Sequence, residues 1–298
     1  MPMIECVPNV SEGRRPEIVD AIASAVTRTS GIRLLDVSSD AAHNRSVITL
    51  AGAATAVGDA VLALFAAALP RIDLRTHHGE HPRIGAVDVM PFVPLHDTPM
   101  AECVALARET GSIVAARFDL PVFLYEEAAT APHRRNLADV RRGQFEGLTA
   151  KLAMPEWRPD FGPSIPHPTA GAVAIGARPL LIAFNVNLAT ADLTIAKRIA
   201  ALVRERDGGL PAVKALGLSI HDRHLTQVSM NLTDYRRTSV AEAFAAVEQA
   251  ARHLGAEVVD SELVGLVPRV ALPPDAESLR LARFDRRQVL EDRLEGLA

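Results

Sequence analysis

The chain has 298 residues, of which 48% are apolar and 23% charged, a balance typical of a globular protein that excludes intrinsic disorder. The net charge is −4 and aromatic residues make up only 4%, so the chain lacks the basic stripes interleaved with aromatics that mark nucleic-acid binding. The longest apolar run, residues 60–69, is too short to span a bilayer and the two cysteines lack metal-type spacing, so we expect a cytoplasmic protein without a membrane or nucleic-acid partner.

The first half of the chain alternates strand and helix patterns. Ser11 is the expected N-cap of the first helix, with Pro16 in its first turn. The resulting order is β-α-β-β-α-β, the split plan of ferredoxin-like folds. Strands are predicted at residues 4–10, 32–37, 45–52, 86–95 and 121–128, and helices at 11–26, 56–69, 99–118 and 133–152.

The second half repeats this order. Between the halves, residues 154–168 hold five prolines and a glycine, a density that prevents regular helix and fits a linker or a binding loop equally well. The fold class is therefore α/β (α+β), with two ferredoxin-like-related subdomains at residues 1–175 and 176–298 and a ligand cleft expected between their sheets. The repeated strands are predicted at 180–188, 212–220, 226–235 and 257–268, and the helices at 190–205 and 239–255.

One loop concentrates histidines. Residues 77–81 read His-His-Gly-Glu-His, which matches the H-x-x-E-H pattern of a class of zinc peptidases. That zinc site needs a helix to place both histidines on one face, but Gly79 weakens a helix and Pro82 disfavours helical backbone at His81. We therefore expect no metal, and a polar surface turn or a proton-transfer loop remain.

The composition of the same loop suits proton transfer beside an anionic substrate. Histidine has an unperturbed pKa of about 6.5, close to cytoplasmic pH, so it can act as base and then as acid. Glu80 or Asp88 is expected to orient the imidazole, and Pro82 to fix the loop. These residues alone do not identify the reaction.

Several blocks resemble a known family. ECVPNVSEGRRPE, LLDVSSDAAHNRSV, HHGEHPRIGAVDVMPFVPL, WRPDFGP, GARPLLIAFNVNL, QVSMNLTDY and SELVGLVP occur in the order found in formiminotransferases. The resemblance runs from residue 4 to about residue 272. It implies two α/β subdomains with a substrate tunnel between them, and a possible homodimer.

The resemblance also implies an activity. Such enzymes move a formimidoyl group from N-formimino-L-glutamate to nitrogen 5 of tetrahydrofolate, the cosubstrate, and so link histidine degradation to one-carbon metabolism. Animal members carry a further cyclodeaminase domain that this sequence does not contain, so cyclodeaminase activity is expected on a separate protein. The implied chemistry requires no metal.

The resemblance assigns particular residues. The family's catalytic histidine falls on His81, whereas His77 is expected to be structural and His78 to face solvent. An aromatic of some animal members is replaced by Ala170, so His167 or Phe161 would have to supply stacking. The family's folate-binding segment corresponds to Gly162, Pro163, Ser164, Ile165, Pro166, His167, Pro168, Thr169, Ala170 and Gly171.

Further polar residues inside the matched blocks are substrate-binding candidates. Arginine suits the carboxylates of glutamate and of the folate tail, although a surface ion pair is an equal alternative for each. Amides near strand ends suit pterin edges, with turn chemistry as the alternative. The tyrosine could donate to a substrate or pack in the core. The candidates are Arg45, Arg83, Arg178, Asn9, Asn185, Asn187, Gln227, Asn231 and Tyr125.

Two other functions stay open. One is a folate-dependent one-carbon enzyme with a different donor, and the other is a folate-binding homologue without turnover. The sequence does not determine the donor, the oligomeric state or which arginine binds which carboxylate.

Overall fold

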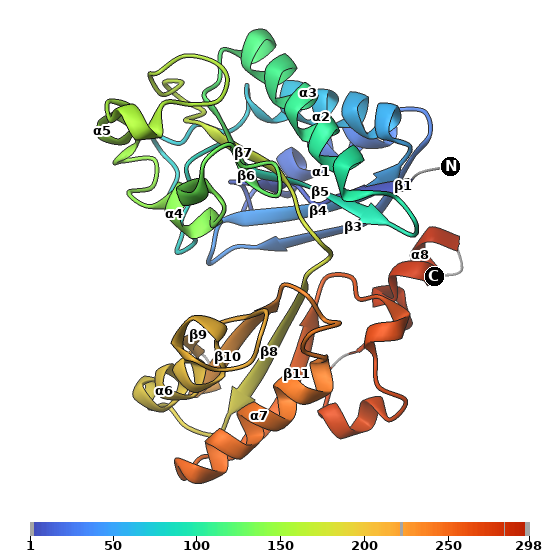
Figure 1. Cartoon of the computed structure of the whole chain (residues 1–298), viewed down its shortest axis with the longest axis vertical. Coiled ribbons are helices and arrows are strands. Elements are labelled where there is room, and N and C mark those ends of the chain that lie inside the picture. The colour runs from blue at the N-terminus through green and yellow to red at the C-terminus, as the bar shows by residue number, and fades with distance from the viewer. Residues whose placement is uncertain (1–2, 221–222, 283, 296–298) are drawn as a thin grey trace. The chain divides into compact units, whose positions relative to one another are not determined.

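The computed structural model describes residues 3–220, 223–282 and 284–295 and divides into two compact units, Met1–Arg178 and Pro179–Ala298. The division lies after Arg178 rather than after residue 175, because strand β7 (Val173–Ala177), which the sequence analysis missed, belongs to the first sheet. Each unit contains helices and a sheet, so the expected α/β class with two subdomains is confirmed. Figure 1 shows the elements of both units.

The first unit is built on a seven-stranded sheet with the spatial order β3, β4, β1 and β2, β5, β7, β6. The predicted strand at residues 4–10 is interrupted at Val7 and Pro8, and both of its parts pair with β4 and β5. Strand β7 runs parallel to β5 and β6, and the other pairings are antiparallel. The remaining strands are β1 (Met3–Cys6), β2 (Asn9–Val10), β3 (Ile32–Asp40), β4 (Arg45–Gly52), β5 (Val87–Leu95) and β6 (Val122–Glu126).

Three long helices cover one face of this sheet: α1 (Pro16–Thr27), α2 (Ala54–Ala68) and α3 (Met100–Phe118). Pro16 is the first residue of α1, as expected, but the N-cap is Arg15. The prediction of Ser11 as N-cap was wrong because its hydroxyl donates to the Gly85 carbonyl instead, at 2.7 Å. This bond ties the start of the chain to the histidine loop.

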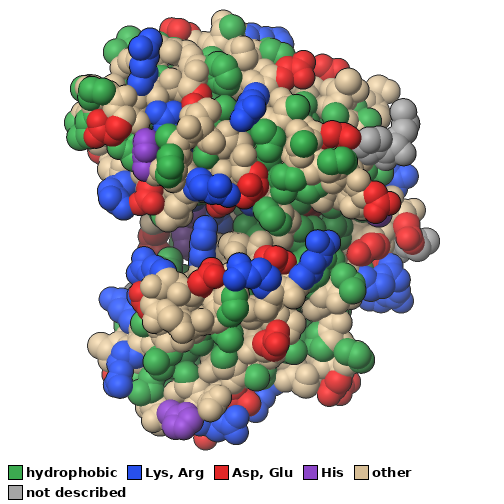
Figure 2. All heavy atoms as spheres, in the orientation of Figure 1, with side chains coloured by type: hydrophobic (Ala, Val, Ile, Leu, Met, Phe, Trp, Pro, Cys, Tyr) green, Lys and Arg blue, Asp and Glu red, His purple; other side chains and the backbone are tan. Residues whose placement is uncertain are grey.

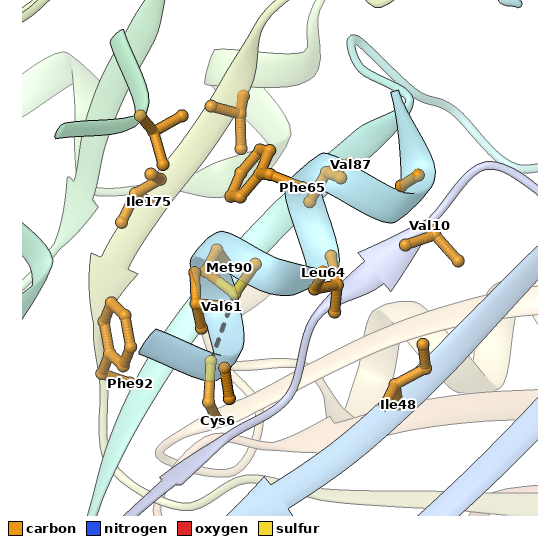
Figure 3. Packing of buried hydrophobic residues seen from close by; sticks show 14 of the residues in the cluster. Cys6, Val10, Ile48, Val61, Leu64, Phe65, Val87, Met90, Phe92 and Ile175 are labelled. Atoms are coloured by element: carbon orange, nitrogen blue, oxygen red, sulfur yellow. Dashed lines mark hydrogen bonds between the residues drawn. The ribbon is translucent and has the colours of Figure 1, made fainter. Parts of the chain in front are cut away.

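The apolar core of the first unit lies between these helices and the sheet. Figure 3 shows Val61, Leu64 and Phe65 of α2 packed against residues of the strands, including Met90. The Cys6 thiol is fully buried there and donates to the Met90 sulfur at 3.2 Å. Both cysteines of the chain are buried and free, so no disulfide joins them.

The opposite face of the sheet is partly covered by short elements. The region 133–152, expected to be helical, contains only α4 (Leu137–Arg141) and α5 (Leu148–Leu152), because Gly143 adopts a left-handed conformation between them. Tyr125 and Phe123 pack into this smaller core. Two 3₁₀ turns, Pro132–Arg134 and Pro155–Trp157, flank it.

The second unit repeats the architecture with one four-stranded antiparallel sheet in the order β11, β8, β10, β9. In both units the first strand of the β-α-β-β-α-β unit therefore lies between the third and the fourth, which confirms the expected duplication. Helices α6 and α7 pack on one face. The elements are β8 (Ile182–Leu188), α6 (Leu193–Val203), β9 (Val213–Ile220), β10 (Leu225–Leu232), α7 (Val240–His253), β11 (Val258–Val264) and α8 (Leu290–Glu295).

The surface is of mixed charge. Figure 2 shows acidic and basic side chains interspersed over the visible face of each unit. None of the helices within the described residues is both long and apolar enough to cross a membrane.

A buried carboxyl group on β1 makes the stability of the fold depend on pH. Glu5 is 4% exposed, and burial raises its pKa from 4.5 to about 7 despite the nearby Arg178 charge. The folded state therefore holds this proton more tightly, and stability falls as pH rises from the unfolded pKa through the folded one. We expect Glu5→Gln to remove up to about 3 kcal/mol of this fall in the free energy of unfolding.

The measurement is urea unfolding of the wild type and the variant at mildly acidic and mildly alkaline pH. Glu109→Gln, at an exposed position of α3, is the control and should leave the pH dependence unchanged. An identical fall in wild type and Glu5→Gln would contradict the assignment.

Candidate active site

The histidine loop has no helical structure between Thr76 and Ala86. This confirms that the H-x-x-E-H spelling does not place two histidines on one helix face. Among the described residues, no group of three or more His, Cys, Asp or Glu side chains is arranged to hold a metal ion.

The three histidines of the loop have different environments. His77 is buried; its Nε2 donates to the Asn44 carbonyl at 2.9 Å and its Nδ1 accepts from Arg83 Nε at 3.1 Å. Both ring nitrogens of His77 therefore form hydrogen bonds within the protein, which agrees with the structural role expected for it. His78 is exposed, as expected, and His81 is half-buried.

The imidazole of His81 is held by the residue that follows it. Its Nδ1 lies 2.7 Å from the Pro82 carbonyl oxygen, and a carbonyl can only accept, so Nδ1 carries the proton. In the neutral ring Nε2 then keeps its lone pair. The expectation that Glu80 or Asp88 orients this ring was wrong: Glu80 is exposed, and Asp88 accepts from the Ile84 N–H and from Arg141.

The charge around His81 favours its neutral form. Burial, followed by the positive charges of Arg45 and Arg141, lowers its pKa from 6.5 to about 3. The ring of His43 lies 6.2 Å away, edge-on. His81 is thus a neutral acceptor at physiological pH, which is the protonation state that a general base needs.

Arg83 is engaged within the loop and with the segment after α4. Its Nε and one Nη2 hydrogen contact His77, and its remaining donors contact Gln144 and both oxygens of Glu146. These bonds use all five donors of a guanidinium. Arg83 can therefore bind a substrate carboxylate only by giving up one of them.

The segment from Gly162 to Gly171 lies beside the histidine loop. Its end pairs with the loop through backbone hydrogen bonds: Leu74 donates to Thr169 at 2.8 Å, and Ala86 donates to Ala170 at 3.0 Å. The proline-rich break is therefore part of the first unit and is ordered against the loop that carries His81. This arrangement favours a binding loop over a linker.

A groove of about 410 Å³ lies between this segment and the histidine loop, lined by residues that include Leu74, His77, Phe145, Pro166 and His167. Phe145 is half-buried there, and the sequence analysis did not single it out. Its position depends on its backbone N–H, which donates to the Arg83 carbonyl at 2.9 Å. The only sequence feature that could have pointed to Phe145 is that it is the single aromatic residue between Gly143 and Gly147.

The two side chains expected to replace the aromatic missing at Ala170 differ in accessibility. Ala170 itself is 1% exposed in the apolar core, and Phe161 packs against that core. His167 lines the groove, where its Nδ1 accepts from the Ala170 N–H at 3.0 Å. His167 and Phe145 are thus the rings placed to stack on a ligand.

Three other candidates of the first unit differ in their surroundings. Asn9 Nδ2 donates to the Val7 carbonyl, which is turn chemistry. Tyr125 is 2% exposed, and burial raises the pKa of its hydroxyl. The charge of Arg178, at the end of β7, acts on Tyr125 and on Glu5.

The amide candidates of the second unit gather on the face of its sheet opposite the helices. Asn185 and Gln227 both donate to Glu262 Oε1, at 2.9 and 3.0 Å. Gln227 also donates to Asn187, which donates to Asp260. Asn231 is exposed and outside this network.

The two carboxylates of this network were missed by the sequence analysis. Asp260 and Glu262 pair with Asn187 and Asn185 in the register of β11 and β8. Because the two carboxylates are two residues apart in a predicted strand, both lie on one face of the sheet. This spacing was the sequence feature that could have identified them.

We expect Arg83→Lys to lower the free energy of unfolding by about 1–3 kcal/mol, because a lysine cannot replace the fork of charged hydrogen bonds to His77 and Glu146. Urea unfolding measures the loss. Arg75→Lys is the matched control, since Arg75 is exposed and pairs only with Asp73 among the described residues. Equal stabilities of the two variants would contradict the role given to Arg83.

The whole chain matches known proteins. The model of the formiminotransferase domain, N-terminal subdomain, matches residues 3–178, and the formiminotransferase domain model matches residues 183–291. A glutamate formimidoyltransferase of Streptococcus pyogenes serotype M1 is 44% identical over 99% of both chains, and one of Thermoplasma acidophilum is 46% identical over 100% of this chain and 99% of its own. A formimidoyltransferase-cyclodeaminase of Rattus norvegicus is 43% identical over 91% of this chain and 51% of its own length. The chain belongs to the formiminotransferase family.

Proposed function

We propose that the protein is a glutamate formimidoyltransferase. It moves the formimidoyl group of N-formimino-L-glutamate to nitrogen 5 of tetrahydrofolate and releases L-glutamate. Two relatives that bear this name and align over 99% or more of this chain support the activity. The single structural observation that carries it is the neutral His81 with an available Nε2.

His81 acts as base and then as acid. Nitrogen 5 attacks the amidine carbon and forms a tetrahedral intermediate, and the attacking nitrogen loses its proton to His81 Nε2. The same proton then passes to the amine of glutamate as the bond between that nitrogen and the amidine carbon breaks. The imidazole therefore ends the cycle neutral, as it began.

Tetrahydrofolate binds in the groove beside residues 162–171. The segment is ordered against the histidine loop, and His167 and Phe145 offer rings for the pterin or benzoyl group. Asn185 and Gln227 remain candidates for pterin edges, and Arg45 and Arg178 for carboxylates. The cytoplasmic location and the homodimer expected from the sequence also stay proposals.

We expect His81→Ala to lower kcat by roughly 10²–10⁴-fold, the usual loss on removing a general acid–base. The assay mixes formiminoglutamate with tetrahydrofolate and follows 5-formimidoyltetrahydrofolate after acid conversion to the methenyl form. His253→Ala, at an exposed position of α7, is the control and should retain the wild-type rate.

The same assay separates the alternatives. An undiminished rate in His81→Ala would refute the mechanism. Wild-type protein that binds folate but gives no product would indicate a binding protein without turnover. Product formed with formiminoglycine as donor, but not with formiminoglutamate, would indicate a different donor.

A further inference from the structure

Two arginines from different elements flank His81. Arg45 begins β4 and Arg141 ends α4, and the charge of each lowers the pKa of His81. Arg45, His81 and Asp88 line one small pocket. Two guanidinium groups that are distant in sequence therefore act electrostatically on the same imidazole.

Asp88 is the carboxylate that bonds to Arg141, one of these two arginines. Arg141 donates to Asp88 Oδ2 through Nε, at 2.9 Å, and through Nη2, while the Ile84 N–H donates to Asp88 Oδ1 at 2.7 Å. Nη1 of Arg141 has no partner among the described residues. One edge of this guanidinium is thus fixed by the protein, whereas the hydrogens of Nη1 remain available to another acceptor.

Arg45 has no such partner. Its side chain is half-buried, and no hydrogen bond or ion pair joins it to another side chain within the described ranges. Burial and the charge of Arg141 lower its pKa although the charges of Asp88 and Asp40 oppose the shift, so the cation is incompletely compensated. A half-buried cation without an ion-pair partner is costly unless an anion binds to it.

Two carboxylates act on Arg45 through their charge, but neither bonds to it. These are Asp88 and Asp40, and Asp40 accepts instead from the backbone N–H and the ring of His43, at 2.8 and 2.7 Å. Glu146 is paired with Arg83. The guanidinium of Arg45 therefore has no hydrogen-bonded anion among the described residues.

We propose that Arg45 and the free edge of Arg141 together bind the α-carboxylate of the formimidoyl donor beside His81. The inference rests on the proposed function and adds the group that positions the donor. Guanidinium groups bind carboxylates through parallel hydrogen bonds, which fix orientation as well as charge. The α-carboxylate fits because it lies two bonds from the leaving nitrogen, which His81 must reach, whereas the γ-carboxylate is farther away.

The test compares formiminoglutamate with N-formimidoyl-4-aminobutyrate, which keeps the γ-carboxylate and lacks only the α-carboxylate. Wild-type kcat/KM should fall at least about 100-fold on the decarboxylated donor, since this donor cannot accept the charged hydrogen bonds from the two guanidinium groups. Arg45→Gln and Arg141→Lys should reduce that discrimination by about tenfold or more. Arg142→Gln, on the exposed neighbour that pairs with Asp139, should retain it.

Calorimetric binding of L-glutamate and 4-aminobutyrate to the same proteins gives a readout that does not need turnover. The wild type should prefer L-glutamate, and Arg45→Gln should lose the preference even if Arg141→Lys folds poorly. If both variants still distinguish the donors with and without the α-carboxylate as the wild type does, in rate and in binding, Arg45 and Arg141 do not bind this carboxylate. If the wild type prefers L-glutamate but transfers no formimidoyl group, the proposed function is wrong and the carboxylate site is still supported.

Discussion

The chemistry of this protein depends on one short hydrogen bond, from His81 Nδ1 to the carbonyl of Pro82. It joins neighbouring residues, so it needs no distant partner to orient the ring. It fixes the tautomer and leaves the Nε2 lone pair free for a proton in transit. Pro82 also keeps the backbone of His81 out of the helical region, and this excludes the metal geometry that the same letters would otherwise suggest.

The surrounding charges determine the protonation state of His81 before the substrate binds. Burial and two guanidinium groups hold the pKa of His81 at about 3, so the ring is neutral but weakly basic. A bound carboxylate would offset one positive charge and raise the pKa of His81. The base would then become stronger when the donor is in place. The positive charge around His81 thus destabilises the site when it is empty and favours the binding of an anionic substrate.

Local patterns in the sequence predicted most of the fold. The period-two and 3.6-residue spacings located the long helices of both units and the strands other than β7, and the duplicated order followed from them. The incorrect predictions have separate causes. Ser11 bonds to Gly85 across the sheet instead of capping α1, and the region before α5 is divided by the left-handed Gly143.

The site was predicted less completely than the fold. Glycine and proline identified the histidine loop as non-helical, and the family resemblance selected His81. Arg141 and Asp88 could not be paired from sequence, because one lies on a short helix and the other on a strand, and they are 53 residues apart. The burial of Ala170 and the five bonds of Arg83 likewise depend on neighbours distant in the chain.

Nuclear magnetic resonance of protein labelled with ¹⁵N-histidine tests the central claim most directly, with His81→Gln used to assign the signals. We predict that His81 has a protonated Nδ1 and an unprotonated Nε2, and that it stays neutral down to about pH 5 in the free protein. A ring protonated at Nε2 in its neutral form, or titration near the ordinary value of about 6.5, would contradict it.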